Sequence, residues 1–159
     1  RLYRLPNVAK MKSENPKLSI ITASYQSVDG LKKTIDSVVT QSYSSWEHII
    51  IDGASQDGTQ DYLKSLSHPN IRWLSERDEG ISDAFNKGVN LAKGDYLYFL
   101  GSGDCLIDSQ VLERIFAKLK HSPLLICGKI LRVTEEGQAL WKAPNKWPAK
   151  FNKKALLFK

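Results

Sequence analysis

Apolar residues in this chain form short continuous runs that alternate with segments of helical spacing. The runs lack the strict apolar–polar alternation of a half-buried strand, which is typical of parallel strands covered on both faces. They occupy residues 18–22, 46–51, 71–74 and 96–100. Between them, apolar side chains recur every three or four positions, the spacing of an amphipathic helix. Helices are expected within residues 28–39, 57–66, 80–92 and 108–119.

Strand and helix thus alternate four times along the chain. This order predicts an α/β fold with a mostly parallel sheet and helices on both faces. Residues 124–127 and 129–133 also have the composition of strands, and residues 135–138 have that of a turn before a return strand at Ala139. The fold is therefore expected to end in a β-hairpin.

Charge is distributed unevenly and suggests where the folded part begins and ends. The chain of 159 residues has a net charge of +6. Residues 1–17 carry +4, residues 141–159 carry +6, and residues 18–140 carry −4. We interpret 1–17 as an N-terminal extension or linker, 18–140 as the folded domain and 141–159 as a basic C-terminal segment. Basic ends are compatible with contact to anionic lipid, although solvation is the simpler interpretation.

The composition argues against several classes of protein. No apolar run approaches the length of a transmembrane helix. The two cysteines are far apart and the three histidines lack metal-ligand spacing, so neither a disulfide framework nor a zinc site is expected. A dehydrogenase is disfavoured because no GxGxxG follows the first strand. A nucleic-acid binder would more often carry its basic residues on the folded domain, which is acidic here.

Two of the apolar runs lead into carboxylates. Asp52 directly follows residues 46–51, and Asp104 closes the loop after residues 96–100. Open parallel sheets bind ligands at the carboxyl ends of their strands, so this pair predicts a site for a polar ligand with a cation. A structural role for Asp52 stays open, because Asp-Gly is also common turn chemistry.

Four motifs, in the right order, resemble family 2 of the glycosyltransferases, which have the Rossmann-like GT-A fold. They are LSIITASY at 18–25, IDGASQDGT at 51–59, ERDEGISDAFNKG at 76–88 and GDYLYFLGSGD at 94–104. Each motif alone is weak, whereas their order makes the combination specific. The resemblance extends over residues 18–133 and implies the nucleotide-sugar-binding part of a GT-A domain. Residues 141–159 would then begin a truncated acceptor-binding part.

The resemblance also implies residues that bind the nucleotide. Ala23 and Tyr25 would lie along the nucleoside, and Asp52 would accept a hydrogen bond from the base. Gly80 and Asp83 would border the donor. For Asp83 a structural interpretation is equally open, because any acid is favourable in the first turn of a helix.

Asp104 would hold Mg²⁺ or Mn²⁺ against the diphosphate, as the DxD-like motif of the family implies. A hard cation with oxygen ligands neutralises the charge that builds on such a leaving group. The sequence departs from the family in three places. Gly103 stands where many members have the first acid of the metal pair, Gln26 replaces an Asn, and Phe85 replaces an Arg found in some members.

The activity implied is inverting transfer of a sugar from a nucleotide diphosphate sugar, a UDP-sugar above all, to a hydroxyl of a saccharide or lipid-linked acceptor. Polysaccharide or glycoconjugate synthesis is the expected context. The catalytic base is not identified, because the acids after Asp104 have the pattern of helix or turn residues. A nucleotide-diphosphate-binding module without catalysis is therefore kept as the alternative. Cysteine usage fits the cytoplasm, with peripheral contact at the inner face of the membrane left open.

Overall fold

The computed structural model describes residues 18–119, 131–134 and 138–142. Contacts between Cα atoms divide the chain into two compact units, Arg1–Leu119 and Lys120–Lys159. The described part of the first unit contains a sheet and four helices, and that of the second contains a pair of strands. The domain boundaries expected after residues 17 and 140 stay predictions.

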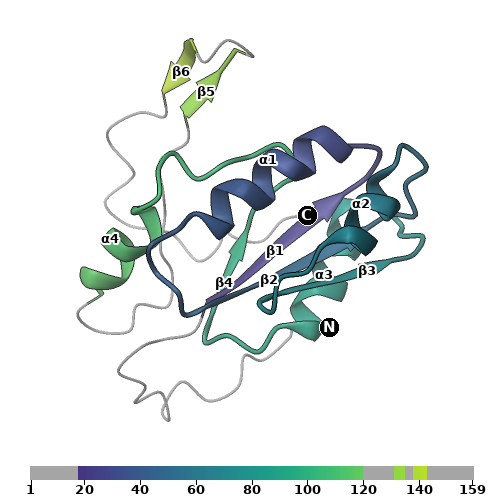
Figure 1. Cartoon of the computed structure of the whole chain (residues 1–159), viewed down its shortest axis with the longest axis horizontal. Helices are drawn as coiled ribbons and strands as arrows, with labels where there is room; N and C mark the ends of the chain where they lie inside the picture. The colour runs from purple at the N-terminus through teal and green to yellow at the C-terminus, as the bar shows by residue number, and fades with distance from the viewer. Residues whose placement is uncertain (1–17, 120–130, 135–137, 143–159) are drawn as a thin grey trace, which may run out of the picture. The chain divides into compact units, whose positions relative to one another are not determined.

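A parallel four-stranded sheet forms the centre of the first unit (Figure 1). Its strand order is β3-β2-β1-β4, and every neighbouring pair is parallel. The strands are β1 (Leu18–Ser24), β2 (Trp46–Asp52), β3 (Ile71–Ser75) and β4 (Tyr96–Phe99). The predicted α/β fold with a parallel sheet is confirmed, because each apolar run became a strand.

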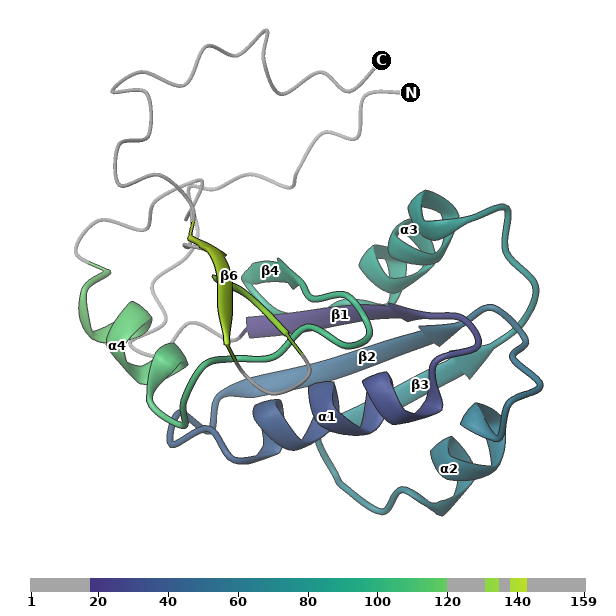
Figure 2. The same ribbon diagram turned by 90° about the horizontal axis from the view of Figure 1, so that it is seen from above.

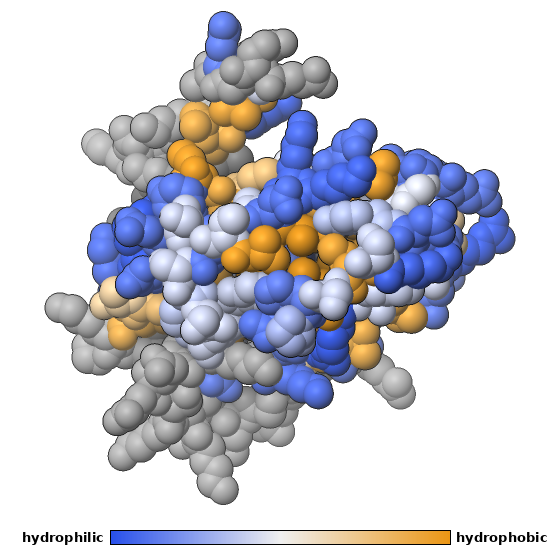
Figure 3. All heavy atoms as spheres, in the orientation of Figure 1, coloured by the Kyte–Doolittle hydropathy of each residue, from blue (hydrophilic) through white to orange (hydrophobic). Residues whose placement is uncertain are grey.

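Helices cover both faces of this sheet, as the alternating order predicted. They are α1 (Val28–Val39), α2 (Thr59–Ser65), α3 (Ile81–Leu91) and α4 (Val111–Ala117). Figure 2 shows the sheet from its edge, with α1 and α2 on one side and α3 on the other. Figure 3 shows the side of α1 and α2, where hydrophilic side chains surround a group of apolar ones near the middle.

Strand β2 lies at the centre of the core, and its side chains are buried at every position. Ile50 packs against Leu31 and Leu63 below α1 and α2. Ile49 and Ile51 face the opposite way, toward α3. Burying one such side chain fully contributes about 1.5–3 kcal/mol. Two covered faces therefore explain why this strand has no apolar–polar alternation.

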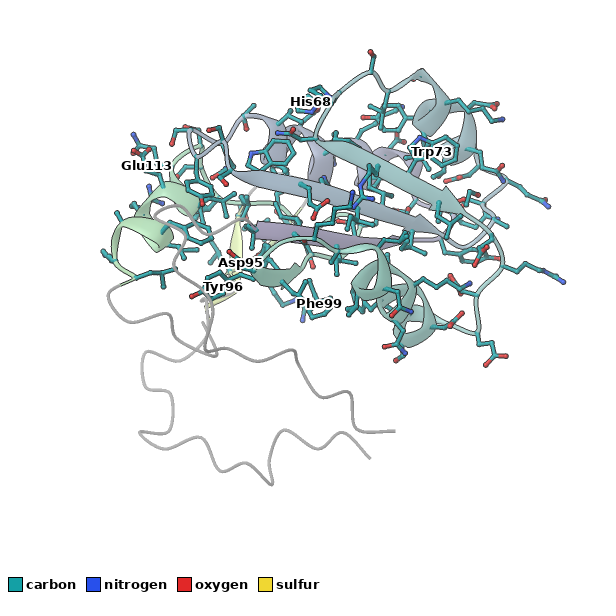
Figure 4. The ribbon with its side chains drawn as sticks, turned by 90° about the horizontal axis from the view of Figure 1, so that it is seen from below. His68, Trp73, Asp95, Tyr96, Phe99 and Glu113 are labelled. Carbon is teal, nitrogen blue, oxygen red and sulfur yellow. The ribbon has the colours of Figure 1, made fainter. Side chains whose placement is uncertain are left out.

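Strand β4 does not have the burial expected from its composition. The sequence predicted a strand covered on both faces, yet Leu97, Tyr98 and Phe99 are between 36% and 47% exposed. β4 pairs with β1, and no other described strand lies against its second edge. Phe85 of α3 covers part of Phe99, with ring centroids 5.0 Å apart. Figure 4 shows Phe99 and Tyr96 on this strand. Composition therefore predicted the strand, whereas burial depends on its place at the edge.

The second unit contains the expected pair of antiparallel strands, β5 (Leu131–Val133) and β6 (Ala139–Lys142). The pairing confirms a β-hairpin near the end of the chain. The strand predicted at 124–127, the turn residues 135–137 and the two basic ends lie outside the described residues. Among the helices that are described, none is long and apolar enough to cross a membrane.

A histidine is buried inside the sheet. The Nε2 atom of His48 lies 2.8 Å from the Thr22 hydroxyl, and its Nδ1 atom has no hydrogen-bond partner. Burial lowers the pKa of His48 from 6.5 to about 3, because the charged imidazolium would lose its hydration. The folded protein thus holds this imidazole neutral.

Acid should weaken the fold from about pH 6.5 downward. The unfolded chain binds a proton at His48 near the ordinary pKa of 6.5, whereas the folded protein does so only near 3. Between these values the unfolded state binds more protons, so the free energy of unfolding falls by at most about 1.4 kcal/mol per pH unit. His48→Gln keeps a polar partner for Thr22 without titrating. Urea unfolding between pH 6.5 and 5 should show a flatter slope for the variant. Equal slopes for the two proteins would contradict this account.

Candidate functional site

The loops after β1, β2 and β4 meet at the carboxyl edge of the sheet. The Gly53 N–H donates to the Ser24 carbonyl over 2.9 Å, and the Ser102 N–H donates to the Ala23 carbonyl over 3.3 Å. Ala23 itself is partly buried near the end of β1. Because parallel strands end at the same edge, these bonds extend the sheet into its loops. The edge predicted to bind a ligand is therefore an ordered surface.

Asp52 connects two of the strand ends from inside. Its side chain is fully buried. Its Oδ1 atom accepts from the Ser55 hydroxyl over 2.5 Å. Its Oδ2 atom accepts from the Ser55 N–H over 3.1 Å and from the Ser75 hydroxyl over 2.6 Å. These bonds match the turn-closing alternative. That Asp52 accepts a hydrogen bond from a base stays a prediction.

Two residues in these loops have left-handed backbone conformations. Gln26 has a φ of 48° and Ala54 a φ of 59°, which costs a residue other than glycine about 1–2 kcal/mol. The Gln26 N–H donates to the Ser55 hydroxyl over 2.8 Å, and the Gln26 side-chain oxygen accepts from the Gln56 N–H over 3.2 Å. These bonds hold the loops after β1 and β2 in one arrangement.

Tyr25, Gly53 and Asp78 come together above the ends of β1, β2 and β3. Tyr25 is 67% exposed, so a large part of its ring faces solvent. A Cβ atom added at Gly53 would lie 2.9 Å from Asp78 Oδ2 and 3.1 Å from Tyr25 Cδ2. The glycine therefore lets a carboxylate and an aromatic ring approach the same stretch of backbone. Our sequence analysis did not identify Asp78 as a candidate functional residue.

Gly80 and Asp83 lie where α3 begins. Gly80 is the N-cap, with a φ of 113° that glycine adopts without strain. Asp83 Oδ2 accepts from the Glu79 N–H and lies 3.2 Å from Lys87 Nζ. These two contacts lower the pKa of Asp83, the backbone bond more than the lysine. Lys87 also pairs with Glu76 over 2.9 Å. Asp83 thus stabilises the loop between β3 and α3, and its contact with a donor stays a prediction.

Asp104 is exposed on the loop after β4. Its N–H donates to the Gly101 carbonyl over 3.0 Å and closes a turn in which Gly103 has a φ of 95°. The Gly103 N–H donates to the Thr34 hydroxyl of α1 over 2.9 Å. Helix α1 therefore fixes the loop that presents the carboxylate.

The exposed carboxylate of Asp104 can supply one oxygen ligand to a hard cation. The described residues include no group of three or more His, Cys, Asp or Glu side chains that would hold a metal by themselves. A carboxylate oxygen is a suitable ligand for Mg²⁺ or Mn²⁺, which also accept phosphate oxygens and water. Asp104 fits a cation that is completed by a bound diphosphate.

The hydroxyl groups that hold these loops were also missed. Ser55, Ser75 and Thr34 are ordinary polar residues in the sequence. Ser75 and Thr34 find partners 23 and 69 residues away. No local pattern indicates such pairs. The one available signal was the Asp-Gly turn, which predicts a hydrogen bond near Asp52 without naming its donors.

The chain belongs to glycosyl transferase family 2, whose model matches residues 19–159. A related protein is the PGL/p-HBAD biosynthesis glycosyltransferase of Mycobacterium bovis, 32% identical over 150 residues. The match covers 91% of this chain and 55% of that relative. The chain spans about a third to about half of the length of the curated relatives it matches. It covers 34% of one relative and 55% of another. The predicted family resemblance is thereby confirmed.

Solved structures of the GT-A kind share the fold. One is TarS of S. aureus in complex with UDP-GlcNAc, with a TM-score of 0.59 and 22% identity over 64% of this chain and 30% of that chain. Another is the mannosyltransferase PcManGT from Pyrobaculum calidifontis in complex with GDP-Man and Mn²⁺. Its TM-score is 0.56, with 20% identity over 60% of this chain and 30% of that chain. These likenesses confirm the predicted GT-A fold.

Replacing Asp52 with Ala should destabilise the protein by about 2–4 kcal/mol. The change removes three hydrogen bonds, so the Ser55 N–H, the Ser55 hydroxyl and the Ser75 hydroxyl lose the acceptor to which they donate. Urea unfolding measures the loss. Asp61→Ala is the control, because Asp61 is exposed and its one ion pair among the described residues is with Lys64, and surface pairs contribute about 0–1 kcal/mol. Similar free energies of unfolding for the two variants would contradict the conclusion that Asp52 holds the loop after β2 and the end of β3 together.

Proposed function

We propose that this chain binds a nucleotide diphosphate sugar at the carboxyl edge of its sheet and provides the donor-binding part of a glycosyltransferase. The observation that carries this proposal is the exposed carboxylate of Asp104, on a loop bonded through Ser102 to the end of β1 at Ala23. Family membership supports the reaction class. The neighbours that hold UDP-GlcNAc and GDP-Man support the ligand class.

The proposed placement follows the order of the loops. The nucleoside lies along Ala23 and the exposed ring of Tyr25, and aromatic faces stack well on bases. Gly80 and Asp83, on the neighbouring loop, border the donor. Asp52 has two possible roles here. It accepts a hydrogen bond from the base, or it holds in place the loops that contact the base, and its burial favours the second role.

Asp104 is the residue proposed to hold the cation, Mg²⁺ or Mn²⁺. When bound, the cation neutralises charge on the diphosphate leaving group. The Mn²⁺ in the complex of PcManGT supports this role. Asp104 supplies a carboxylate that the turn around Gly103 holds in place.

The proposed reaction is an inverting displacement. The acceptor oxygen forms a bond to the sugar carbon, the bond from that carbon to the diphosphate oxygen breaks, and the acceptor proton goes to a carboxylate base. Neither described acid beyond Asp104 is unpaired. Asp108 lies 2.8 Å from Arg114, and Glu113 accepts from the Ser42 hydroxyl. The base is therefore not assigned to either.

The partners we propose are a UDP-sugar or a related donor and a saccharide or lipid-linked acceptor. The Mycobacterium bovis relative is named for PGL/p-HBAD biosynthesis, which supports a glycoconjugate context. A cytoplasmic location with peripheral membrane contact through the basic ends belongs to this proposal.

Asp104→Ala should remove the Mn²⁺-dependent part of nucleotide binding. In calorimetry with UDP and GDP, Mn²⁺ should tighten binding to the natural chain. In the presence of Mn²⁺ the variant should bind UDP or GDP at least about tenfold more weakly than the natural chain, because a carboxylate ligand is missing. Asp95→Ala is a matched control, since Asp95 is an exposed acid just before β4 and not on the loop after it.

Loss of Mn²⁺ dependence in the Asp95 variant, or its retention in the Asp104 variant, would contradict the assignment of the metal. Sugar release from a UDP-sugar or GDP-sugar, measured in a separate assay of the same protein with and without acceptors, separates an enzyme from the alternative. Tight binding without turnover with any acceptor would favour a nucleotide-binding module.

Gly103→Asp should strengthen Mn²⁺ binding several-fold. A Cβ atom at this position meets no atom within 4 Å, and a second carboxylate beside Asp104 adds an oxygen ligand. The positive φ of Gly103 costs the new residue about 1–2 kcal/mol of stability. Gly103→Asn carries the same backbone strain without the charge. Equal Mn²⁺ affinities of the two variants, measured by calorimetry with UDP, would argue against a cation at this turn.

A further inference from the structure

We propose that Asp78 selects the base of the nucleotide by accepting a hydrogen bond from a ring N–H, while Tyr25 stacks on the base. This inference rests on the proposed function and adds a specificity-determining residue to it. It names the donor class as nucleoside diphosphates whose base carries a ring N–H on its pairing edge, which are those of uridine and guanosine. It also assigns to the loop after β3 a task that the sequence suggested for Asp52.

The geometry places an acceptor beside a stacking surface. Asp78 Oδ2 and Tyr25 Cδ2 lie 2.9 Å and 3.1 Å from one point, the position of a Cβ atom added to Gly53. The carboxylate and the ring thus both lie close to Gly53, which has no side chain. Tyr25 is 67% exposed, and Asp78 is only half-buried, so both are accessible to a ligand.

Asp52 is less suited to this task. Its side chain is fully buried, and both of its carboxylate oxygens already accept hydrogen bonds from Ser55 or Ser75. A base would have to break these bonds and reach a buried oxygen. Breaking them leaves polar groups unpaired, which costs about 1–3 kcal/mol for each group.

Asp78 has one oxygen bonded and one oxygen available. Its Oδ1 atom accepts from the Gly80 N–H over 3.0 Å, which fixes the carboxylate. Its Oδ2 atom accepts no hydrogen bond from the described residues. The surrounding loop is fixed as well, because Lys87 donates to the Arg77 carbonyl over 2.7 Å. A carboxylate that is held by one oxygen, and whose other oxygen has no partner among the described residues, is suited to recognition.

The chemistry of the bases then sets the preference. The uracil ring carries N3–H and guanine carries N1–H, and each donates to a carboxylate. Cytosine and adenine have a lone pair at the corresponding ring nitrogen, which repels a carboxylate oxygen. Charge-assisted hydrogen bonds are roughly twice as strong as neutral ones, so the difference is substantial.

Asp78→Asn tests the proposal sharply because the two oxygens are not equivalent. The Asn oxygen should remain on the Gly80 N–H, which places the amide NH₂ where Oδ2 was. That group donates, so it should oppose a ring N–H and favour a ring nitrogen with a lone pair. Calorimetry with UDP, GDP, CDP and ADP, each with Mn²⁺, measures the preference.

The natural chain should bind UDP or GDP at least about tenfold more tightly than CDP and ADP. In Asp78→Asn this ratio should fall by about tenfold or more, with CDP gaining. Asp61→Asn is the control and should keep the natural ratio, because Asp61 lies on α2 and pairs with Lys64. Thermal unfolding of each variant checks that the fold is intact.

A second variant tests the role of the glycine. Gly53→Ala places a methyl group 2.9 Å from Asp78 Oδ2 and 3.1 Å from the Tyr25 ring. It should weaken UDP and GDP binding. Unchanged affinity in this variant would overturn the arrangement proposed here.

The outcomes separate this inference from the function beneath it. If the natural chain binds none of the four nucleotides, the proposed function fails, and this inference fails with it. If it binds them and Asp78→Asn weakens all four equally or not at all, the function stands and the selection by Asp78 is wrong.

Discussion

A buried carboxylate holds the carboxyl edge of this sheet together. Asp52 receives three hydrogen bonds, two from Ser55 in its own loop and one from Ser75 at the end of β3. Burial strips the carboxylate of water, so these donors must replace its hydration. The Asp52 carboxylate has all three donors only when the loop after β2 and the end of β3 are both in place. This constraint also positions Gly53, which immediately follows Asp52 and near which both Tyr25 and Asp78 lie.

The polar groups at the carboxyl edge of the sheet fall into two sets. Buried or internally bonded groups, such as Asp52 and the Thr34 hydroxyl, fix the loops. Tyr25 and Asp104 are exposed, and these are the groups that we propose to contact a ligand. Loops that are already ordered lose little conformational entropy when they bind, and preorganisation of this kind improves affinity. Family 2 membership supports the proposal that this edge binds the diphosphate of a sugar donor together with a cation.

The fold could be predicted from the sequence because its signals are local. The Ile49–Ile51 run is apolar without alternation, and β2 is indeed covered on both faces. The similar run in β4 predicted a strand but not its exposure, since composition carries no information on which strand lies at an edge. Parallel order brought Asp52 and Asp104 to the same edge, as expected. The roles within that edge were harder to predict. Contacts between distant segments decide whether Asp52 faces a ligand or Ser75. They also decide whether Asp78 lies near Tyr25.

The most direct test is a crystal structure of this chain with UDP and Mn²⁺, using the anomalous scattering of manganese to locate the ion. The account predicts a manganese peak beside the Asp104 carboxylate, diphosphate oxygens on the same ion, and the base against the Tyr25 ring. Manganese and nucleotide bound elsewhere, with the loops around Asp104 and Tyr25 empty, would contradict the central claim.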